Sequence, residues 1–580
     1  MSDKLQAYKE AKYALPSKIL TWFLYGAGME NFGKDKKPVE VPMPTFGPDE
    51  LLVRIDAVGI CFSDIKVINQ GNQHPRIVGR DMVKDPVTLG HEPAITVVGV
   101  GENIKDKYQT GQRFIVQADV FYKGKSMAFG YVLAGAQTQY QVITKELLNG
   151  DEGAYLLPLK ESTGYAEAAL TEAWSCVVAS YRIDRRSTLK PEGTLWIIGT
   201  PAGGDYTLDM NIGSKTVVAT DVKGSLLDAL KAQAGNFKLV ETPSFAPLDL
   251  EAFAGEYEGG FDDIIVLGAD ADVIEKSAQF LGRFGTMNIV ASEPLARPVQ
   301  IDVGKVHYMD HSYIGTTETS IGSAYKPVRN PSQLRSGGCA WFIGGAGPMG
   351  KMHVQLALEM ENGPSKVLIT DVGAERLQSA MEQFIPIADR KGIEFLAVNP
   401  MEMSTEEFAN LVDEFTGGTK FDDIVVMAPV AALIAGAVPY LGEEGLMNIF
   451  AGVPIGTIAT LDLTSVYTKQ IRFVGSSGSK LSDMLDTLNA AESGQLSTGT
   501  ALAAIGGMDA SWDGMLAVKE LKYTGKVVIY PQIENLPLTS LPELKVRLPN
   551  VYDKLTDGEF WNSDAEKELF ESMLKLDSEG

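Results

Sequence analysis

Cysteine and histidine are scarce in this chain, which has three cysteines and five histidines among 580 residues. The cysteines, Cys61, Cys176 and Cys339, are too few and too far apart to form the disulfide framework of a secreted protein. Free thiols persist in a reducing compartment. We therefore expect a cytoplasmic protein.

Basic residues are also in short supply. Lysine and arginine total 51 against 75 aspartates and glutamates, which gives a formal charge of −24 and a pI of about 4.7. Proteins that bind nucleic acid neutralise phosphates with an excess of lysine and arginine, so we expect no nucleic-acid partner. A small anionic substrate could still bind in a local basic pocket.

A membrane-targeting segment is not evident either. The first ten residues mix charges and are not followed by an apolar stretch, so we predict no signal peptide. The uncharged run 424–442 approaches the ~20 residues of a membrane span, but it contains Pro429 and Pro439. An internal copy of this run carries four charged residues, so we expect no membrane partner. These are Asp270, Asp272, Glu275 and Lys276.

The chain contains an internal repeat. Residues 261–290 and 421–450 match without a gap at an offset of 160, with thirteen of thirty positions identical. Upstream, Thr220-Asp221 corresponds to Thr370-Asp371 at an offset of 150. Each copy alternates short β-branched runs with longer helical stretches, which is typical of βαβ units and a parallel sheet. We predict two tandem Rossmann-type, doubly wound domains of the α/β class.

The second copy has a glycine-rich loop between a strand and a helix. The loop contains Gly345, Gly347 and Gly350 with Pro348 and Met349 between them, and an acid, Asp371, follows the next strand. Such glycines allow a tight turn and close approach to a pyrophosphate, which the amino end of the helix binds through free N–H groups. The pattern predicts a dinucleotide site.

The first copy departs from this pattern. Its strand at 196–199 is followed by Thr200-Pro201, and the offset between copies grows from 145 at the tryptophans to 150 at the acids, so five residues are missing. This loss exceeds one helical turn of ~3.6 residues. We expect a domain that keeps its sheet and has lost its ligand, although a second nucleotide site remains the alternative.

Four residues of the first third have the chemistry of a catalytic zinc site: Cys61, the pair His91-Glu92, and Glu172. Zinc binds thiolate, imidazole and carboxylate, and three protein ligands leave a fourth position open for water or substrate. Cys61 follows an alternating strand-like run, and His91 is expected at the end of an extended run. The alternative for each cysteine is an ordinary buried thiol.

These features together resemble the zinc-dependent medium-chain dehydrogenases/reductases, the alcohol and polyol dehydrogenase superfamily, and within it the L-sorbose 1-phosphate reductase branch. The resemblance covers roughly residues 15–190 and 336–535. The segments that carry it are Gly59 to Asp64, Gly90-His91-Glu92, Gly111 to Phe114, Ala169 to Glu172, Gly344 to Gly350, Phe421 to Val426, Gly475 to Gly478, Gly494 to Leu496, Ile505 to Ala510 and Gly525 to Ile529.

The resemblance implies four regions. A β-rich, GroES-like catalytic domain would span 1–190 and be completed by about 490–535. A degenerate Rossmann copy would span 191–335, and the cofactor-binding Rossmann domain 336–489. An acidic extension, 536–580, lies outside the family plan.

The same resemblance implies roles for the metal-site residues. Cys61, His91 and Glu172 would bind one catalytic zinc, which acts as a Lewis acid. Glu92 would lie behind the site or replace water, and Asp64 would orient His91. Ser63 matches the family's proton-relay hydroxyl, with Lys66 in place of a histidine found in some relatives. No cysteine lies between Arg113 and Cys176, so we predict no structural zinc.

The implied activity is hydride transfer between NAD(H) and a polyol, ketose or sugar phosphate. Asp371 would accept the ribose hydroxyls and favour NAD(H), while Arg376 keeps NADP(H) open. His74 and Arg76 could contact a substrate phosphate, and Lys123 and Lys125 are weaker candidates. The alternatives are a lyase or epimerase that uses NAD transiently, a simple secondary-alcohol dehydrogenase, or a binding protein that kept the fold.

Dimers of the superfamily commonly join their Rossmann sheets edge to edge. We therefore expect the first copy to imitate that partner within one chain, as a pseudo-dimer, with the retained segment 313–317 at the joining edge. Further homo-oligomerisation is not excluded. The tail from Asp564 to Lys575 could dock on this or another subunit through Leu569, Phe570 and Met573.

Overall fold

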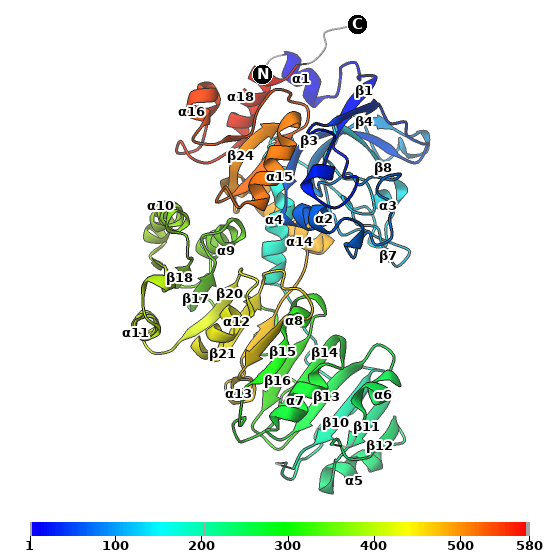
Figure 1. The fold of residues 1–580 in the computed structure, drawn as a ribbon, viewed down its shortest axis with the longest axis vertical. Helices are drawn as coiled ribbons and strands as arrows, with labels where there is room; N and C mark the ends of the chain where they lie inside the picture. The colour runs from blue at the N-terminus through cyan, green and yellow to red at the C-terminus, as the bar shows by residue number, and fades with distance from the viewer. Residues whose placement is uncertain (1–2, 202, 247, 576–580) are drawn as a thin grey trace. The chain divides into compact units, whose positions relative to one another are not determined.

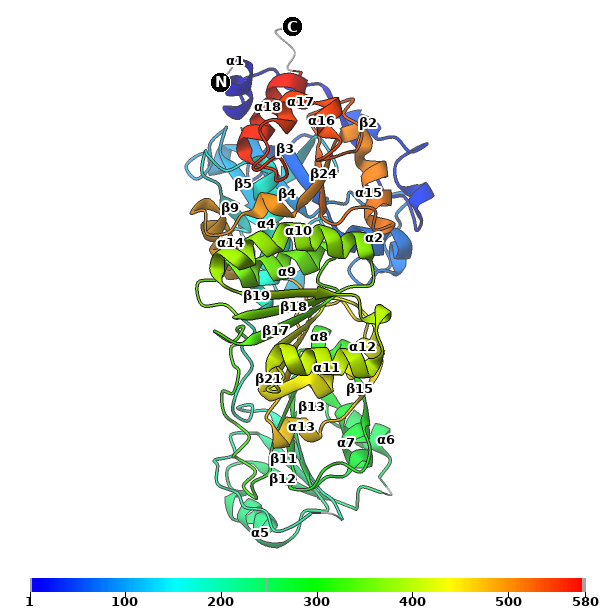
Figure 2. The same cartoon turned by 90° about the vertical axis from the view of Figure 1, so that its left-hand side faces the viewer.

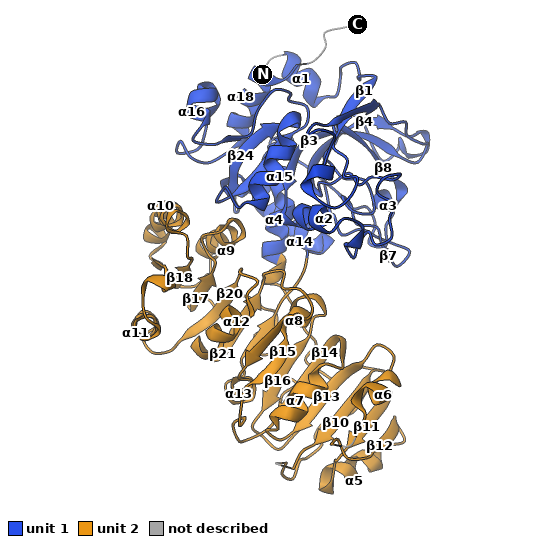
Figure 3. Cartoon of the chain, viewed as in Figure 1, with its two compact units in different colours: residues 1–178, 478–580 blue, residues 179–477 orange. Residues whose placement is uncertain are grey.

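The computed structural model of the chain describes residues 3–201, 203–246 and 248–575. It divides into two compact units (Figure 3). Unit 1 contains residues 1–178 and 478–580, and unit 2 contains residues 179–477. Both ends of the chain therefore belong to unit 1, and unit 2 is inserted between them.

Unit 1 is built on a mostly antiparallel sheet of order β26-β24-β25-β3-β4-β5-β9, with β8 beside β3 (Figure 1). A core of residues from both ends of the chain packs against it, including Trp22, Val58, Met508 and Ile529. The sheet strands are β3 (Leu51–Ile60), β4 (Glu92–Val100), β5 (Arg113–Val116), β8 (Tyr140–Ile143), β9 (Leu156–Pro158), β24 (Leu502–Gly507), β25 (Lys526–Tyr530) and β26 (Thr539–Ser540). Shorter strands are β1 (Lys18–Thr21), β2 (Val39–Pro42), β6 (Phe121–Tyr122) and β7 (Lys125–Ser126). The helices are α1 (Asp3–Lys9), α2 (Phe62–Gln70), α3 (Lys145–Leu148), α4 (Tyr165–Ser180), α14 (Leu481–Glu492), α15 (Ser511–Lys519), α16 (Leu544–Arg547), α17 (Pro549–Tyr552) and α18 (Ser563–Met573).

Unit 2 contains two six-stranded parallel sheets of the same topology. Their orders are β12-β11-β10-β13-β14-β16 and β19-β18-β17-β20-β21-β23, which in each copy is the order 3-2-1-4-5-6 of a doubly wound nucleotide-binding fold. The first copy comprises β10 (Thr194–Gly199), β11 (Thr216–Thr220), α5 (Gly224–Gln233), β12 (Lys238–Thr242), α6 (Leu250–Gly255), β13 (Phe261–Leu267), α7 (Ala271–Ala278), β14 (Leu281–Val290), β15 (Val299–Asp302), α8 (Val303–Tyr308) and β16 (Ser312–Thr316). The second comprises β17 (Cys339–Ile343), α9 (Pro348–Glu359), β18 (Lys366–Thr370), α10 (Ala374–Lys391), β19 (Glu394–Val398), α11 (Thr405–Thr416), β20 (Phe421–Val426), α12 (Ala431–Ala437), β21 (Leu441–Ile449), β22 (Ile458–Leu461), α13 (Thr464–Thr468) and β23 (Arg472–Val474).

Helices cover both faces of the second sheet. Side chains alternate along β17, so Trp341 and Ile343 share a core with Phe408 of α11 and Ile434 of α12. The opposite face is covered by α9 and α10, which lie side by side (Figure 2). This burial on both faces explains why its strands are continuously apolar rather than alternating.

The first copy has lost the whole helix after its first strand, not just one turn of it. Between β10 and β11 the described residues form no helix, and an extended segment at 206–212 takes its place. Tyr206 and Ile212 of this segment pack on the sheet face with Leu195 and Ile197. Thr207 pairs with residues 319–321, since its N–H donates to Thr319 O (3.0 Å) and its carbonyl accepts from Ile321 N (3.1 Å).

The two copies meet along a pseudo-twofold axis. β15 pairs antiparallel with β22, and Gln300 of the first copy lies opposite Thr460, its own counterpart at the repeat offset of 160. Val299 and Ile301 pair with Leu461 and Ala459 in the same symmetric register. A single hydrophobic core continues through both copies and includes these four side chains.

Two glycines extend this symmetry to the edge strands. A Cβ on Gly315 of β16 would lie 2.6 Å from the Cβ of Tyr467, and a Cβ on Gly475 would lie 3.0 Å from the Cα of His307. Gly315 and Gly475 are counterparts in the repeat, as are His307 and Tyr467. Each copy therefore presents the same surface to the other, which is the property of an isologous interface.

The described C-terminal residues, up to 575, pack against other parts of unit 1. β26 pairs with β24, and α18 contacts α1. Leu569 and Phe570 are buried, Met573 is half-buried, and Lys4 Nζ donates to the carbonyls of Glu571 (2.9 Å) and Leu574 (3.0 Å). The tail therefore docks on its own chain through the helical face expected from its sequence.

Glu167, in the first turn of α4, provides a test of this docking. Burial, together with the negative charge of Glu566 on α18, raises the pKa of Glu167 from its ordinary value of 4.5 to about 7. The native state thus holds the proton more tightly than the unfolded state, so stability falls as the pH rises from about 4.5 through 7. Glu167→Gln mimics the neutral form and should unfold at a higher temperature than the native chain at pH 8, with equal melting near pH 4. The expected gain is on the order of 2 kcal/mol; equal melting temperatures at pH 8 would show that the native Glu167 ionises without cost.

No helix among the described residues is long and apolar enough to cross a membrane.

Candidate active site

The candidate metal ligands come together because β3 and β4 are antiparallel neighbours. The end of β3 therefore lies beside the start of β4, and Gly59 pairs with Glu92. Cys61 follows β3 directly and is the N-cap residue of α2. His91 directly precedes β4. The residues just before it form no helix or turn: Val87 makes an isolated β-bridge with Leu24, and Gly90 has φ +92°.

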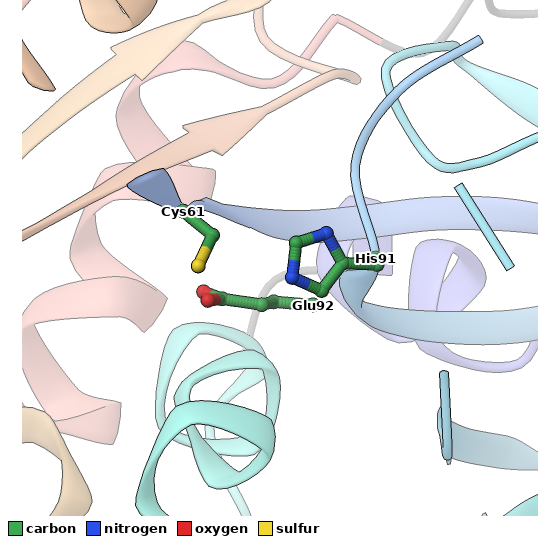
Figure 4. Close-up of side chains that lie close together, drawn as sticks. All are labelled: Cys61, His91 and Glu92. Carbon is green, nitrogen blue, oxygen red and sulfur yellow. The ribbon is translucent and has the colours of Figure 1, made fainter. Parts of the chain in front are cut away.

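Three side chains form a cluster with metal-ligating geometry. One ligand atom from each of Cys61, His91 and Glu92 lies within 4.8 Å of the others (Figure 4). The sulfur, ring nitrogen and carboxylate point toward one another from the adjacent ends of two strands. This donor set of thiolate, imidazole and carboxylate is one that Zn²⁺ accepts.

Asp64 holds His91 in place. Its Oδ1 lies 3.3 Å from His91 Nδ1 and accepts the N–H of Gly90 at 3.3 Å, while Oδ2 accepts the N–H of Cys61 at 3.0 Å. Burial opposes ionisation of Asp64, but His91 and these backbone donors outweigh it and keep its pKa below the ordinary value. One nitrogen of the His91 ring is thus engaged, which leaves Nε2 for a ligand.

Glu92 is held from behind by Lys526 on β25. Lys526 Nζ lies 2.6 Å from Glu92 Oε1, and both side chains are buried. Burial opposes the charge of Lys526, yet the facing Glu92, Cys61 and Glu172 raise its pKa above the ordinary value. The other oxygen, Oε2, is buried without a hydrogen-bond partner in the described chain. A buried, unpaired carboxylate oxygen is costly unless a cation binds there.

Glu172, on α4, lies next to this cluster but outside it. It is 8% exposed, and burial raises its pKa to about 7, while His91 and Lys526 oppose that shift and Glu92 adds to it. Cys176, one turn further along α4, donates from Sγ to Glu172 Oε1 at 3.9 Å. The structure thus brings two carboxylates to the site rather than one.

An aromatic and charged group lies on the other side of His91. The ring of Tyr131 is 5.5 Å from the His91 ring and 5.6 Å from the ring of His74. Arg76 stacks on Tyr131 at 4.7 Å and pairs with Asp119 at 2.7 Å. The positive charge of Arg76 therefore lies near the candidate metal site, in contact with a ring that touches His91.

The remaining polar candidates of unit 1 lie on the surface. Ser63 and Lys66 are half-buried on α2, directly after Cys61. Burial lowers the pKa of His74 to about 4, and the positive charges of Arg76 and Lys66 contribute to this shift. Lys123 and Lys125 are exposed at the β6–β7 hairpin, where Lys123 stacks on Tyr122.

The glycine-rich loop of the second copy leads directly into the amino end of α9. Gly347 is the N-cap residue, and no side chain caps the helix. Pro348 occupies the first turn, and Met349 beside it is half-buried. A Cβ on Gly350 would collide with the carbonyl of Gly344 and lie 2.7 Å from Gly345 Cα. The helix can therefore pack this closely on the strand only with glycine at 350.

Asp371 and Arg376 lie together at the end of β18. Arg376 donates to Asp371 Oδ1 from Nη2 (2.6 Å) and from Nε (3.1 Å), and Gly373 N donates to the same oxygen at 3.0 Å. The Asp371 side chain is 6% exposed and that of Arg376 is 34% exposed. A carboxylate and a guanidinium are thus both available at this edge of the sheet.

The corresponding edge of the first copy is closed by the chain itself. Thr200 Oγ1 donates to the carbonyl of Leu267 at 2.7 Å. Asp221, the counterpart of Asp371, accepts from Phe245 N (2.7 Å) and Ser244 Oγ (3.0 Å). A shallow cavity of about 460 Å³ in this copy lies elsewhere, beside α6 and the start of β14.

Proteins similar to this chain include alcohol and sugar-phosphate dehydrogenases. Residues 47–152, which contain Cys61 and His91, match the alcohol dehydrogenase GroES-like domain. The chain is 23% identical over 540 residues to mannitol-1-phosphate 5-dehydrogenase of Aliivibrio fischeri, covering 91% of this chain and 93% of the relative. It is 27% identical to L-sorbose 1-phosphate reductase of Klebsiella pneumoniae, covering 47% of this chain and 71% of the relative.

A solved structure supports the fold. The 2R,3R-butanediol dehydrogenase of Bacillus subtilis aligns with 88% of this chain and 99% of its own, with a TM-score of 0.51 and 14% identity. A GroES-like domain match, a metal-ligating cluster and a doubly wound nucleotide-binding fold make the chain similar to dehydrogenases of the alcohol and polyol type. Its relatives include a sugar-phosphate dehydrogenase, a sugar-phosphate reductase and alcohol dehydrogenases.

Proposed function

We propose that the chain is a zinc-dependent oxidoreductase that transfers a hydride between a nicotinamide dinucleotide and a polyol, ketose or sugar phosphate. The observation that carries this proposal is the cluster of Cys61, His91 and Glu92 in a GroES-like domain of a chain with one glycine-rich loop. The names of the relatives, which include a sugar-phosphate dehydrogenase and a sugar-phosphate reductase, support the substrate class.

The donor atoms fit a zinc ion. Cys61 supplies a thiolate and His91 its Nε2, and the unpaired Oε2 of Glu92 supplies a buried negative charge directed at the cluster. We propose Glu172 as the third resident ligand, because no lysine or arginine pairs with it in the described structure, whereas Lys526 holds Glu92. Glu92 would then be the exchangeable neighbour. One bound zinc would act as a Lewis acid toward the substrate oxygen.

Gly59 tests the role of Glu92. A Cβ at Gly59 would collide with Glu92 Oε2, although the strand conformation itself accepts alanine. Gly59→Ala should therefore displace the carboxylate and weaken zinc binding by about tenfold, the low end of the range for groups that orient metal ligands. Zinc competition with a chromophoric chelator measures this. Gly26→Ala, where the nearest atom to the new Cβ is 3.5 Å away, is the matched control. Equal affinities in both variants would refute the role of Glu92.

The second Rossmann copy would hold the cofactor. The free N–H groups of α9 would bind its pyrophosphate, with Gly345, Gly347, Pro348, Met349 and Gly350 forming the loop. We propose NAD(H), because Asp371 would accept the ribose hydroxyls once Arg376 turns away. NADP(H) requires the opposite, with Arg376 facing a 2′-phosphate, and remains the second candidate.

The proton would leave the site through residues of α2. Ser63 and then Lys66 follow Cys61 on this helix and are both half-buried, so they lie between the cluster and solvent. His74 and Arg76 would face an anionic end of the substrate, as their contacts with Tyr131 beside His91 suggest. This arrangement favours a sugar phosphate over a simple secondary alcohol.

A panel of sugar phosphates, polyols and simple alcohols, assayed with NAD(H) and NADP(H), tests the proposed reaction. We expect net change in the absorbance of reduced nicotinamide, with a sugar phosphate turned over most efficiently. Turnover without any net absorbance change would instead support the second candidate, a lyase or epimerase that uses its cofactor transiently.

We also propose that the chain contains a pseudo-dimer of Rossmann domains and binds one cofactor. The symmetric pairing of β15 with β22 supports the pseudo-dimer. The closed edge of the first copy supports binding of the cofactor by the second copy alone. We further propose domain boundaries near 191, 336 and 489, with the catalytic domain completed by about 490–535; the two compact units divide somewhat earlier, after residues 178 and 477.

Gly315→Val tests whether this interface is internal. The valine side chain would be forced against Tyr467 and the carbonyl of Ile289. We therefore expect the free energy of unfolding to fall by roughly 1–3 kcal/mol, as for other overpacked cores. The melting temperature measured by calorimetry should fall by the same amount at all protein concentrations, because both partners belong to one chain. A loss that shrinks as concentration rises would instead place the interface between two chains.

A further inference from the structure

The C-terminal helix α18 carries a buried carboxylate that contacts α4, the helix of Glu172. Glu566 is 4% exposed, and its two oxygens accept the first two N–H groups of α4. Oε2 accepts from Tyr165 N at 2.5 Å, and Oε1 accepts from Ala166 N at 2.7 Å. Donors at the start of a helix lack partners within it. Glu566 thus caps α4 from a segment 400 residues away in the chain.

The same carboxylate is bound by β25. Tyr530, the last residue of that strand, donates its hydroxyl to Glu566 Oε1 at 2.8 Å, and its side chain is fully buried. The first residue of β25 is Lys526, which holds Glu92 at 2.6 Å. Glu566 therefore joins two elements, the helix that carries Glu172 and the strand that holds Glu92.

Burial is the largest influence on Glu566 and keeps its pKa above the ordinary value. The two N–H groups of α4, the Tyr530 hydroxyl and the charge of Arg113 favour the ionised carboxylate and limit that shift. Arg113 also stacks on the Tyr165 ring at 4.1 Å. A negative charge at the amino end of a helix is further favoured by the helix dipole.

Other contacts hold the side and the carboxyl end of α4. Thr498 Oγ1 donates to the Glu167 carbonyl at 2.9 Å, and Trp174 Nε1 donates to the Thr498 carbonyl at 3.2 Å. Ser175 Oγ lies 2.8 Å from Ser479 Oγ, and the Ser180 carbonyl accepts from Asn448 Nδ2 at 3.1 Å. Glu566 holds the amino end. Glu172 lies two turns from that end, so a shift of α4 along its axis moves Glu172 by the same distance.

We propose that Glu566 is a positioning residue for the metal site, through which docking of the C-terminal helix sets the distance of Glu172 from Cys61 and His91. This inference rests on the proposed zinc-dependent function. It assigns a role to a C-terminal segment that the GroES-like match at 47–152 does not include. Zinc affinity should accordingly depend on a residue that touches neither the metal nor any of its ligands.

The test replaces zinc by Co²⁺ in the full chain and compares Glu566→Gln with Asp564→Asn. Asp564 is an exposed acid in the first turn of the same helix, so the control loses the same charge from the surface. We expect Glu566→Gln to bind Co²⁺ about three- to tenfold more weakly, in a chelator competition well below its melting temperature, and to alter the visible spectrum of the bound ion. Asp564→Asn should match the native chain in both measurements.

The outcomes separate the possible failures. A lower melting temperature in Glu566→Gln with native Co²⁺ affinity and spectrum would overturn the positioning role and leave only a stabilising one. If the native chain itself binds no Co²⁺, both the proposed function and this inference fail. If Glu566→Gln does not fold, Tyr530→Phe decides, because it removes one hydrogen bond to the carboxylate: two- to threefold weaker binding supports the inference, and native binding overturns it.

Discussion

Cys61→Ser is expected to lose its zinc and to lower turnover by about a thousandfold. A serine hydroxyl is a poor replacement for a thiolate ligand, and loss of Lewis-acid stabilisation worth several kcal/mol corresponds to this factor in rate. Metal analysis of the purified variant and the rate of reduced-nicotinamide formation measure the two effects.

Cys339→Ser is the control for this substitution. Cys339 is a buried cysteine on β17 of unit 2, outside the metal-ligating cluster. The control should keep its zinc and most of its turnover. Native zinc content and native turnover in Cys61→Ser would contradict the assignment of Cys61, whatever the control shows.

Gly347→Val is expected to weaken cofactor binding by about a hundredfold while leaving zinc content and melting temperature unchanged. Its φ of −74° and ψ of 170° suit any residue, and the nearest atom to a new Cβ is 3.5 Å away. The folded chain should therefore accept valine. A bound pyrophosphate should not, because the second glycine of such a loop is where the phosphates approach the backbone. Quenching of protein fluorescence by the reduced cofactor measures the affinity.

Gly204→Val makes the equivalent change in the first copy. No atom lies within 4 Å of a Cβ at that position, so this variant also should fold. It should bind the cofactor with native affinity and stoichiometry, because the first copy is expected to bind none. Reduced binding in Gly204→Val, or native binding in Gly347→Val, would contradict the assignment of the cofactor to the second copy.

The repeat and the glycine loop were readable from the sequence because both are local patterns. Gly345 to Gly350 lie between a strand and a helix. The change from an apolar strand run to helical periodicity on either side of the glycines predicts the turn that the loop makes. The loss of the nucleotide-binding loop and helix in the first copy could be predicted only in part. The sequence predicts five missing residues, but the complete replacement of a helix by 206–212 depends on packing against residues 319–325, far along the chain.

The sequence predicts which residues form the metal site but not how they are arranged in space. Cys61 and His91 meet because β3 and β4 pair in one register, and no local pattern defines that register. Lys526, Tyr131 and Asp119 were missed altogether, since each comes from a distant segment and carries no motif. The choice between Glu92 and Glu172 as the resident ligand depends on which carboxylate already pairs with a basic side chain. The pairing of Glu92 with Lys526 is visible only in the three-dimensional structure.

The C-terminal segment shows the same limit. Its apolar face, Leu569 and Phe570, was apparent from helical periodicity, and the structure buries it on unit 1. Glu566 was not distinguishable from the other acids of an acidic tail. Its importance comes from facing the start of α4, which lies 400 residues earlier.

Native mass spectrometry of the chain with cofactor tests the central claim most directly, because it counts metal and nucleotide on the same molecule. We predict one zinc and one nicotinamide dinucleotide on each chain of 62.6 kDa, with loss of zinc in Cys61→Ser and loss of the dinucleotide in Gly347→Val. A chain without metal, or one that binds two dinucleotides, would contradict an enzyme with a single active site built from one metal cluster and one Rossmann copy.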